Sequence, residues 1–241
     1  MQPMSKLIAI ALLLVGSTAL ASCEPARTPE SRDDLVQEEQ ATVATIQDIV
    51  ANPVLVTLGQ GEPAPAKASQ AMAFGDRITT ADQALAEVGL ANGAVFRIGG
   101  DAALTLRPSQ LLLDAGQMIT WVEGAVSEPL EIVTPAGIAG IRGTTVFVNI
   151  DGNPAAPVEF FSWEGQVAVR LTAGGEEVIL NSGEQLFVAP GEDDIEALRQ
   201  RVQPLDKAEA LQRLDESALI NGFGSPIPTR PAIEATVEAL E

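Results

Sequence analysis

Residues 134–148 read TPAGIAGIRGTTVFV, which combines one proline and three glycines with an apolar, β-branched run. Pro135 has a fixed φ and biases Thr134 toward an extended backbone. The glycines tolerate a positive φ or the close approach of another backbone, whereas residues 144–148 favour a strand. This part of the sequence predicts a strand, a tight irregular turn and a second strand.

Arg142 lies where the predicted turn returns to the sheet. Its planar guanidinium donates several hydrogen bonds and can hold a carboxylate or a group of carbonyls. Two interpretations are open. Arg142 is either largely buried, where it bridges turn carbonyls or a nearby acid, or exposed, where it contacts a partner.

Short apolar runs recur on both sides of this stretch, separated by glycine, asparagine or aspartate. Such spacing is typical of an all-β protein, and Asn92-Gly93 between two of the runs predicts a hairpin turn. The expected strands cover residues 44–50, 54–58, 85–90, 95–98, 104–106, 111–113, 118–122, 130–133, 145–150, 160–163, 166–171, 177–180 and 185–189.

A glycine–glutamine pattern repeats along the predicted strands. The pair Gly116-Gln117 has counterparts at residues 165–166 and, with a glutamate inserted, at 183–185. Repetition of this kind favours similar coils that bury their apolar sides against one another. We therefore expect an all-β domain over residues 42–190, either a wound two-sheet fold or a β-solenoid-like fold.

The pattern changes after Pro190. Apolar residues at helical spacing within 192–203 and 205–219, separated by Pro204, predict two short helices that cover an end of the sheet. Residues 222–231 are expected to form a loop, and the acidic remainder a short frayed helix. Residues 191–241 are thus predicted to hold short helices and an acidic tail.

The stretch at 134–148 resembles the FecR-like domain, whose most recognisable segment reads Thr-Pro, a run of small residues, and Arg-Gly-Thr before an apolar strand. Further matches are GDRITT at 75–80, ANGAVFRI at 91–98, EGQV at 164–167 and NSGEQ at 181–185, so the resemblance covers residues 42–190. Phe147 also matches. The positions assigned to the family motif, in a structural or binding role, are Thr134, Pro135, Gly137, Gly140, Arg142, Gly143 and Thr144.

The resemblance implies a role without chemistry of its own. Transducers of this family carry a cytoplasmic anti-sigma segment before a membrane helix, whereas this chain has a leader-like segment in that place. The resemblance therefore implies a binding or scaffold module and not direct control of a sigma factor.

Residues 1–23 combine Lys6, an apolar run at 7–15 and the ending LASC, which contains Cys23, the one cysteine of the chain. The run is too short for an ordinary transmembrane helix. The pattern resembles a bacterial lipoprotein signal at 1–22, after which Cys23 would carry a diacylglycerol. The alternatives are an ordinary secretory cleavage site with an incidental cysteine, and an uncleaved anchor. Residues 23–41, with proline and mixed charge, would form a tether.

The net charge of the chain is −19. A strongly acidic surface repels the phosphates of nucleic acids and the headgroups of anionic lipids. The sequence therefore predicts no nucleic-acid partner, and membrane contact only through a lipid on Cys23, at the periplasmic or extracellular face of a bacterial envelope.

Several classes of catalytic site are excluded because the sequence has no histidine or tyrosine, and its single cysteine is assigned to lipidation. Ser/His/Asp and Cys/His sites and histidine-ligated metals need those residues. Neither Asp193-Asp194 nor the segment 151–153 has the ligand spacing of a known calcium loop. We expect no enzyme, no cofactor and no metal site.

Trp121 and Trp163 each lie beside a predicted strand and a glycine turn. Packing in the core or at a sheet edge is one interpretation, and an exposed aromatic platform for a sugar or peptide is the other. The expected function is a non-enzymatic module that binds a protein or an envelope polymer. A sensory partner of a separate FecR-type transducer and a carbohydrate-binding module on the cell wall are the alternatives.

Overall fold

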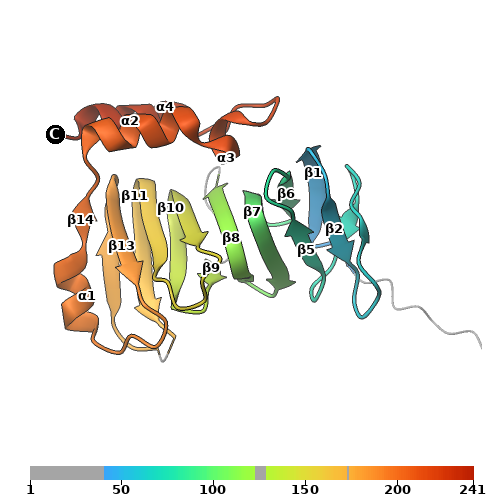
Figure 1. Cartoon of the computed structure of the whole chain (residues 1–241), viewed down its shortest axis with the longest axis horizontal. Coiled ribbons are helices and arrows are strands. Elements are labelled where there is room, and N and C mark those ends of the chain that lie inside the picture. The colour runs from blue at the N-terminus through green and yellow to red at the C-terminus, as the bar shows by residue number, and fades with distance from the viewer. Residues whose placement is uncertain (1–40, 123–128, 173) are drawn as a thin grey trace, which may run out of the picture. The chain divides into compact units, whose positions relative to one another are not determined.

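The computed structural model describes residues 41–122, 129–172 and 174–241, and for Arg142 it describes the backbone alone (Figure 1). The predicted leader at 1–22 and the tether up to residue 40 lie outside the described residues, and so does Cys23.

The strands of the described residues form one sheet of antiparallel pairs, with a single parallel pairing between β8 and β9. The strands are β1 (Ala44–Val50), β2 (Val54–Thr57), β3 (Ala64–Pro65), β4 (Ala71–Met72), β5 (Arg77–Thr80), β6 (Leu85–Leu90), β7 (Ala94–Arg107), β8 (Gln110–Val122), β9 (Leu130–Val133), β10 (Gly137–Ile150), β11 (Val158–Leu171), β12 (Glu177–Leu180), β13 (Glu184–Val188) and β14 (Gln203–Pro204). The helices are α1 (Ile195–Arg201), α2 (Lys207–Glu216), α3 (Ala218–Asn221) and α4 (Arg230–Ala239).

Four long strands, β7, β8, β10 and β11, bend halfway along their length, and the two halves pair with different neighbours. Residues 95–99 of β7 pair with β6, whereas residues 103–105 pair with β5. The hydrogen-bond register shifts between Gly99 and Ala103, where the strand bends. The separate strands predicted at 95–98 and 104–106 are thus halves of one strand, because its pairing with β8 resumes beyond the bend.

The bends divide the sheet into two layers with the apolar core between them. One layer, which we call the helix-covered layer, contains β1, β6, β13 and one half of each long strand. The other, the open layer, contains β2, β5, β9, β12 and the remaining halves. The wound two-sheet prediction is therefore confirmed.

The core is aliphatic, as expected from a sequence with few aromatic residues. Phe96 and Ile98 of the helix-covered layer and Leu104 and Leu113 of the open layer are fully buried. Alternate positions of each half-strand point inward, which follows from the period-two geometry of strands. Each such side chain contributes roughly 1.5–3 kcal/mol to folding.

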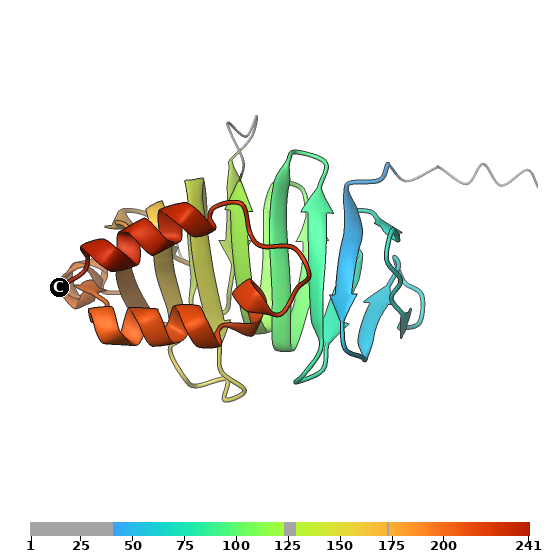
Figure 2. The ribbon, with the colours of Figure 1, turned by 90° about the horizontal axis from the view of Figure 1, so that it is seen from above.

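The helices α2, α3 and α4 lie along the outer face of the helix-covered layer (Figures 1 and 2). Leu214 and Val237 from these helices pack against Ile119 and Phe161 of the sheet. The prediction that two helices cover an end of the sheet is wrong in this respect. They cover a face, because the outward positions of β7, β8 and β11 are also apolar and require burial.

The turn at 51–53 connects β1 and β2, but these two strands do not pair with each other. β1 pairs with β6 and β4, whereas β2 pairs with β5 and β3. The chain therefore passes from one layer to the other at Asn52-Pro53, and each layer gains a strand at this end of the sheet.

Candidate functional site

The Thr-Pro segment forms the tight turn that the sequence predicts. Thr134 is 3% exposed; its hydroxyl Oγ1 donates to the carbonyl of Gly137 (2.8 Å) and accepts from the backbone N–H of Gly137 (3.0 Å). The backbone N–H of Thr134 donates to the same carbonyl (2.9 Å). One side chain thus closes the turn between β9 and β10, which is a structural role.

The glycine run that follows belongs to a strand and not to the turn. Gly137 and Gly140 pair with β11 inside β10, and the strand bends at Arg142 and Gly143, where Gly143 has a φ of 63°. The irregular turn predicted over this run is therefore shorter than expected, since strand pairing on both sides holds the glycines extended. The backbone of Arg142 pairs with Gln166; its side chain lies outside the described residues.

The threonines after the bend tie β10 to β11 and to the C-terminal segment. The hydroxyl of Thr144 donates to the carbonyl of Glu164, and Thr145 Oγ1 lies 2.9 Å from Glu164 Oε1 and 2.7 Å from Thr229 Oγ1. Both threonines are buried. The described side chains of the family motif therefore stabilise the fold.

Arg97, which lies outside the 134–148 stretch, makes further contacts that hold the C-terminal segment on the sheet. Its side chain is 1% exposed; Nε donates to Glu87 Oε2 (2.6 Å) and the Nη atoms donate to the carbonyls of Leu219 (2.9 Å), Ile220 (3.2 Å) and Ser225 (2.7 Å). The guanidinium also lies over the rings of Phe223 and Trp121, 4.2 and 5.2 Å from their centroids. The sequence signal was an arginine at an outward position of the apolar strand 94–98.

Trp121 and Trp163 both face the C-terminal helices and are each 3% exposed. Phe161 packs edge-on against Trp163 with 4.8 Å between ring centroids. The two indoles are on one face, but they are covered, so they do not form the exposed sugar or peptide platform considered from the sequence. Both tryptophans therefore agree with the other interpretation, in which they pack in the core or at a sheet edge.

A cavity of about 270 Å³ lies between the helix-covered layer and α2, bordered by Phe147, Asn149 and Trp163. Arg213 closes one wall through ion pairs with Glu159 and Glu209. Burial lowers the pKa of Arg213, but its hydrogen bonds to these carboxylates outweigh burial and raise the pKa above its ordinary value. The charged side chains of this wall are thus paired with one another.

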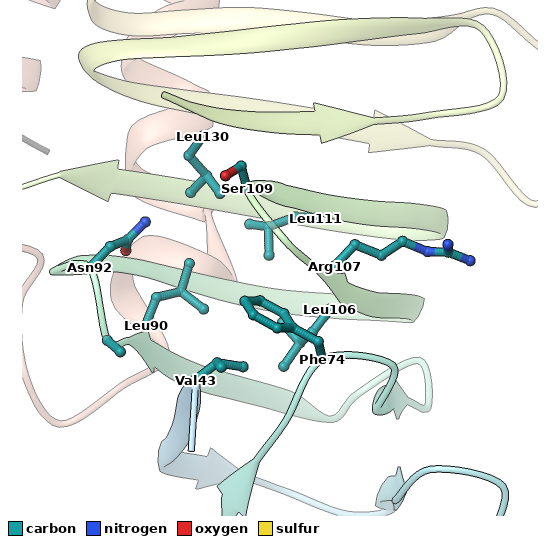
Figure 3. Close-up of a pocket in the computed structure, with 10 residues that line it drawn as sticks. Val43, Phe74, Leu90, Asn92, Leu106, Arg107, Ser109, Leu111 and Leu130 are labelled. Atoms are coloured by element: carbon teal, nitrogen blue, oxygen red, sulfur yellow. The ribbon is translucent and has the colours of Figure 1, made fainter. Parts of the chain in front are cut away.

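A pocket of about 150 Å³ opens between the two layers, on the side opposite the bend of β7. Figure 3 shows apolar side chains converging on it from β6, β7, β8 and β9 and from the loop that carries Phe74. Asn92, Arg107 and Ser109 lie at its edge. Its apolar lining consists of Val43, Phe74, Leu90, Ala91, Leu106, Leu111 and Leu130.

Arg107 differs from the other arginines whose side chains the structure describes. It is exposed and, within the described residues, has no hydrogen-bond or ion-pair partner. Each of the others contacts a carboxylate, namely Arg77, Arg97, Arg170, Arg199, Arg201, Arg213 and Arg230. An unpaired cation therefore borders an apolar pocket in a chain of net charge −19.

The acidic segments considered for calcium have local roles. Asp194 caps α1 by accepting from the N–H of Ala197 (2.9 Å), and Asp151 accepts from the N–H of Asn153 (2.8 Å). Over residues 41–122, 129–172 and 174–241, no group of three or more histidine, cysteine or acidic side chains is placed to hold a metal ion. In the same part of the chain, no helix has the length and apolar character needed to cross a membrane.

The described residues form a bent, two-layer β domain. Residues 76–168 match the family model described as FecR protein, which confirms the resemblance for that segment. No curated protein matches the sequence.

Two crystal structures of a "putative anti-sigma factor" from Parabacteroides distasonis ATCC 8503 are similar in structure. One has a TM-score of 0.44 at 16% identity and aligns over 57% of this chain and 64% of its own. The other has a TM-score of 0.41 at 16% identity and aligns over 54% and 60%. The aligned region thus spans less than two thirds of either neighbour.

Proposed function

We propose that this protein is a non-enzymatic envelope lipoprotein whose FecR-like segment acts by contact with a protein or an envelope polymer. The observation that carries the proposal is the FecR match over residues 76–168, which covers the central bent strands. The described motif residues and most described charged groups are occupied in holding these strands and helices together. The part of the domain that is available for contact with a partner is therefore its exposed surface.

The proposed anchor is a diacylglycerol on Cys23, joined to β1 by the tether at 23–41. Such an anchor would hold the domain near one membrane surface. The charge of −19 favours basic protein surfaces or cation-bridged polymers over an anionic bilayer.

Photo-crosslinking in intact cells tests this function. A photoreactive amino acid replaces, one at a time, exposed apolar residues on different parts of the domain: Leu58, Phe74, Ile179, Phe187 and Leu211. A module that works by contact gives a discrete crosslinked product at one or more of these sites, at native expression. The absence of a product at every site contradicts the proposal.

A second candidate, a sensory partner of a separate transducer, is supported by the same FecR match. Deletion of the gene, followed by measurement of extracytoplasmic sigma-factor reporters, separates the two. A pure scaffold leaves induction unchanged, and a sensory partner lowers it. If a fragment of this protein confined to the cytoplasm restores induction, the envelope-contact model is wrong.

A further inference from the structure

We propose that the pocket between the layers receives one apolar side chain of a partner protein, while a carboxylate two residues away in the same segment pairs with Arg107. This inference rests on the proposed function, since it names where the contact occurs and what chemistry the partner presents.

The size and lining of the pocket fit a single side chain. Its floor contains Leu106 and Leu111, each 1% exposed, while Phe74 at the mouth is 48% exposed. A cavity of about 150 Å³ accommodates a benzene-sized group. The pocket is therefore suited to a phenylalanine or leucine side chain and is too small for an acyl chain of membrane length.

The positive charge of Arg107 at the rim determines which group the partner presents beside its apolar side chain. Arg107 is the described arginine side chain without a carboxylate partner, and it lies at the edge of the apolar pocket. The net acidic surface of the protein repels a carboxylate, whereas Arg107 at this edge attracts one, so an acidic side chain beside the pocket gains an attraction.

The geometry indicates that the two contacts lie side by side. In Figure 3 the guanidinium of Arg107 extends away from Leu90 and Phe74, beyond the apolar side chains. In an extended peptide, side chains two residues apart point to the same side, at about 7 Å along the chain. An apolar residue in the pocket thus places the acid two positions away beside the pocket, within the range of a long arginine side chain.

The test is a titration of the full chain, with leucine methyl groups labelled for NMR, by acetyl-Phe-Ala-Glu-amide. We expect the methyl signals of Leu90, Leu111 and Leu130 to shift. The matched peptide acetyl-Phe-Ala-Gln-amide should bind about two- to fivefold more weakly, the factor that an exposed ion pair supplies. Arg107→Gln should abolish this difference, whereas the control Arg201→Gln on α1 should preserve it.

A pocket-filling variant gives the second measurement. Ala91 is exposed at the rim, so Ala91→Phe fills the mouth without a change in the buried floor, and binding of both peptides should be lost. Equal binding of the two peptides, or no shift at these leucines, contradicts the proposal. Sodium octanoate binding at these methyl groups without peptide binding would instead identify a free acyl acid as the occupant.

Failure of the pocket and failure of the proposed function give different results. If a crosslinked partner forms equally in the wild-type chain and in Ala91→Phe, the pocket proposal is wrong and contact through another surface stands. If no position gives a crosslinked product, the function itself is contradicted.

Discussion

At the residue scale, single glycines decide whether the strands can bend between layers. Gly116 of β8 has a φ of 79°, and a Cβ at this position would overlap the backbone of Ala102 in β7. Two constraints, the positive φ and the close approach, therefore act on one residue. Gly93 has a φ of 90° with open space around it, so it carries the first constraint alone.

We predict that Gly116→Ala lowers the free energy of unfolding by more than Gly93→Ala. A positive φ costs an alanine roughly 1–2 kcal/mol at both sites, and overpacking adds about 1–3 kcal/mol at Gly116. Urea unfolding of the two variants measures the difference. Equal losses would show that β7 moves away from the new methyl group at little cost.

Arg97 is the second case in which one residue holds distant parts of the chain together. Arg97→Ala leaves the carboxylate of Glu87 and the carbonyls of Leu219 and Ser225 without their donor, so we predict a loss of about 3–5 kcal/mol. Arg77→Ala is the matched control, since its ion pair with Asp114 is exposed, and should cost about 0–1 kcal/mol.

Chemical unfolding, monitored through the emission of the two tryptophans, measures the stability of both arginine variants. Both indoles lie under the helices that Arg97 holds, so their emission should also shift to longer wavelength in native Arg97→Ala. Similar stability losses in the two arginine variants would contradict the assigned role of Arg97.

At the element scale, an ion pair joins β9 to β11 across the intervening β10. Glu131 Oε1 lies 2.6 Å from Arg170 Nη2, and Glu131 Oε2 accepts from Gln110 of β8 (3.0 Å). Burial raises the pKa of the Glu131 carboxyl, but the hydrogen bonds from Arg170 and Gln110 outweigh burial and bring the pKa below its ordinary value of 4.5. The open layer is therefore sensitive to acid at this point.

The direction of the pH effect follows from the lowered pKa. The stabilisation is present above pH 4.5, the ordinary value, and is lost as the pH falls through the lower pKa of the folded state. We predict that Glu131→Gln reduces the acid-dependent fall in unfolding free energy below pH 4.5, measured by denaturant titrations at successive pH values. Arg170→Gln should reduce the same fall. If the unfolding free energy of both variants still falls with pH as it does in the wild-type chain, the Glu131–Arg170 pair is not the source of the fall.

At the scale of the whole molecule, the proposed lipid on Cys23 decides where the domain works. Each buried CH₂ of an acyl chain supplies about 0.8 kcal/mol of membrane affinity, and a charge of −19 supplies no attraction to an anionic surface. Cys23→Ser should therefore move the full chain from the membrane fraction to the soluble or unprocessed fraction, with loss of the diacylglycerol mass. Ser31→Ala, in the proposed tether, is the control that should keep both, and unchanged fractionation and mass in Cys23→Ser would refute lipidation.

The sequence by itself determined the local structure of this protein. The apolar runs predicted the strands, Asn92-Gly93 predicted the turn between β6 and β7, and Thr134-Pro135 predicted the turn between β9 and β10. These features depend on residues within a few positions of one another, and the backbone preferences of glycine, proline and β-branched residues act at that range.

Only the tertiary structure decided which segments meet. Period-two spacing identifies a half-buried strand but not the layer to which each half belongs, so the bends in β7 and β8 were missed. The carbonyls that accept from Arg97 lie 122 to 128 positions away, and the apolar face that includes Trp121 is buried because helices from the end of the chain cover it. The pocket likewise gathers residues from 43 to 130 that no local pattern connects, because a site between layers exists only once those layers have packed.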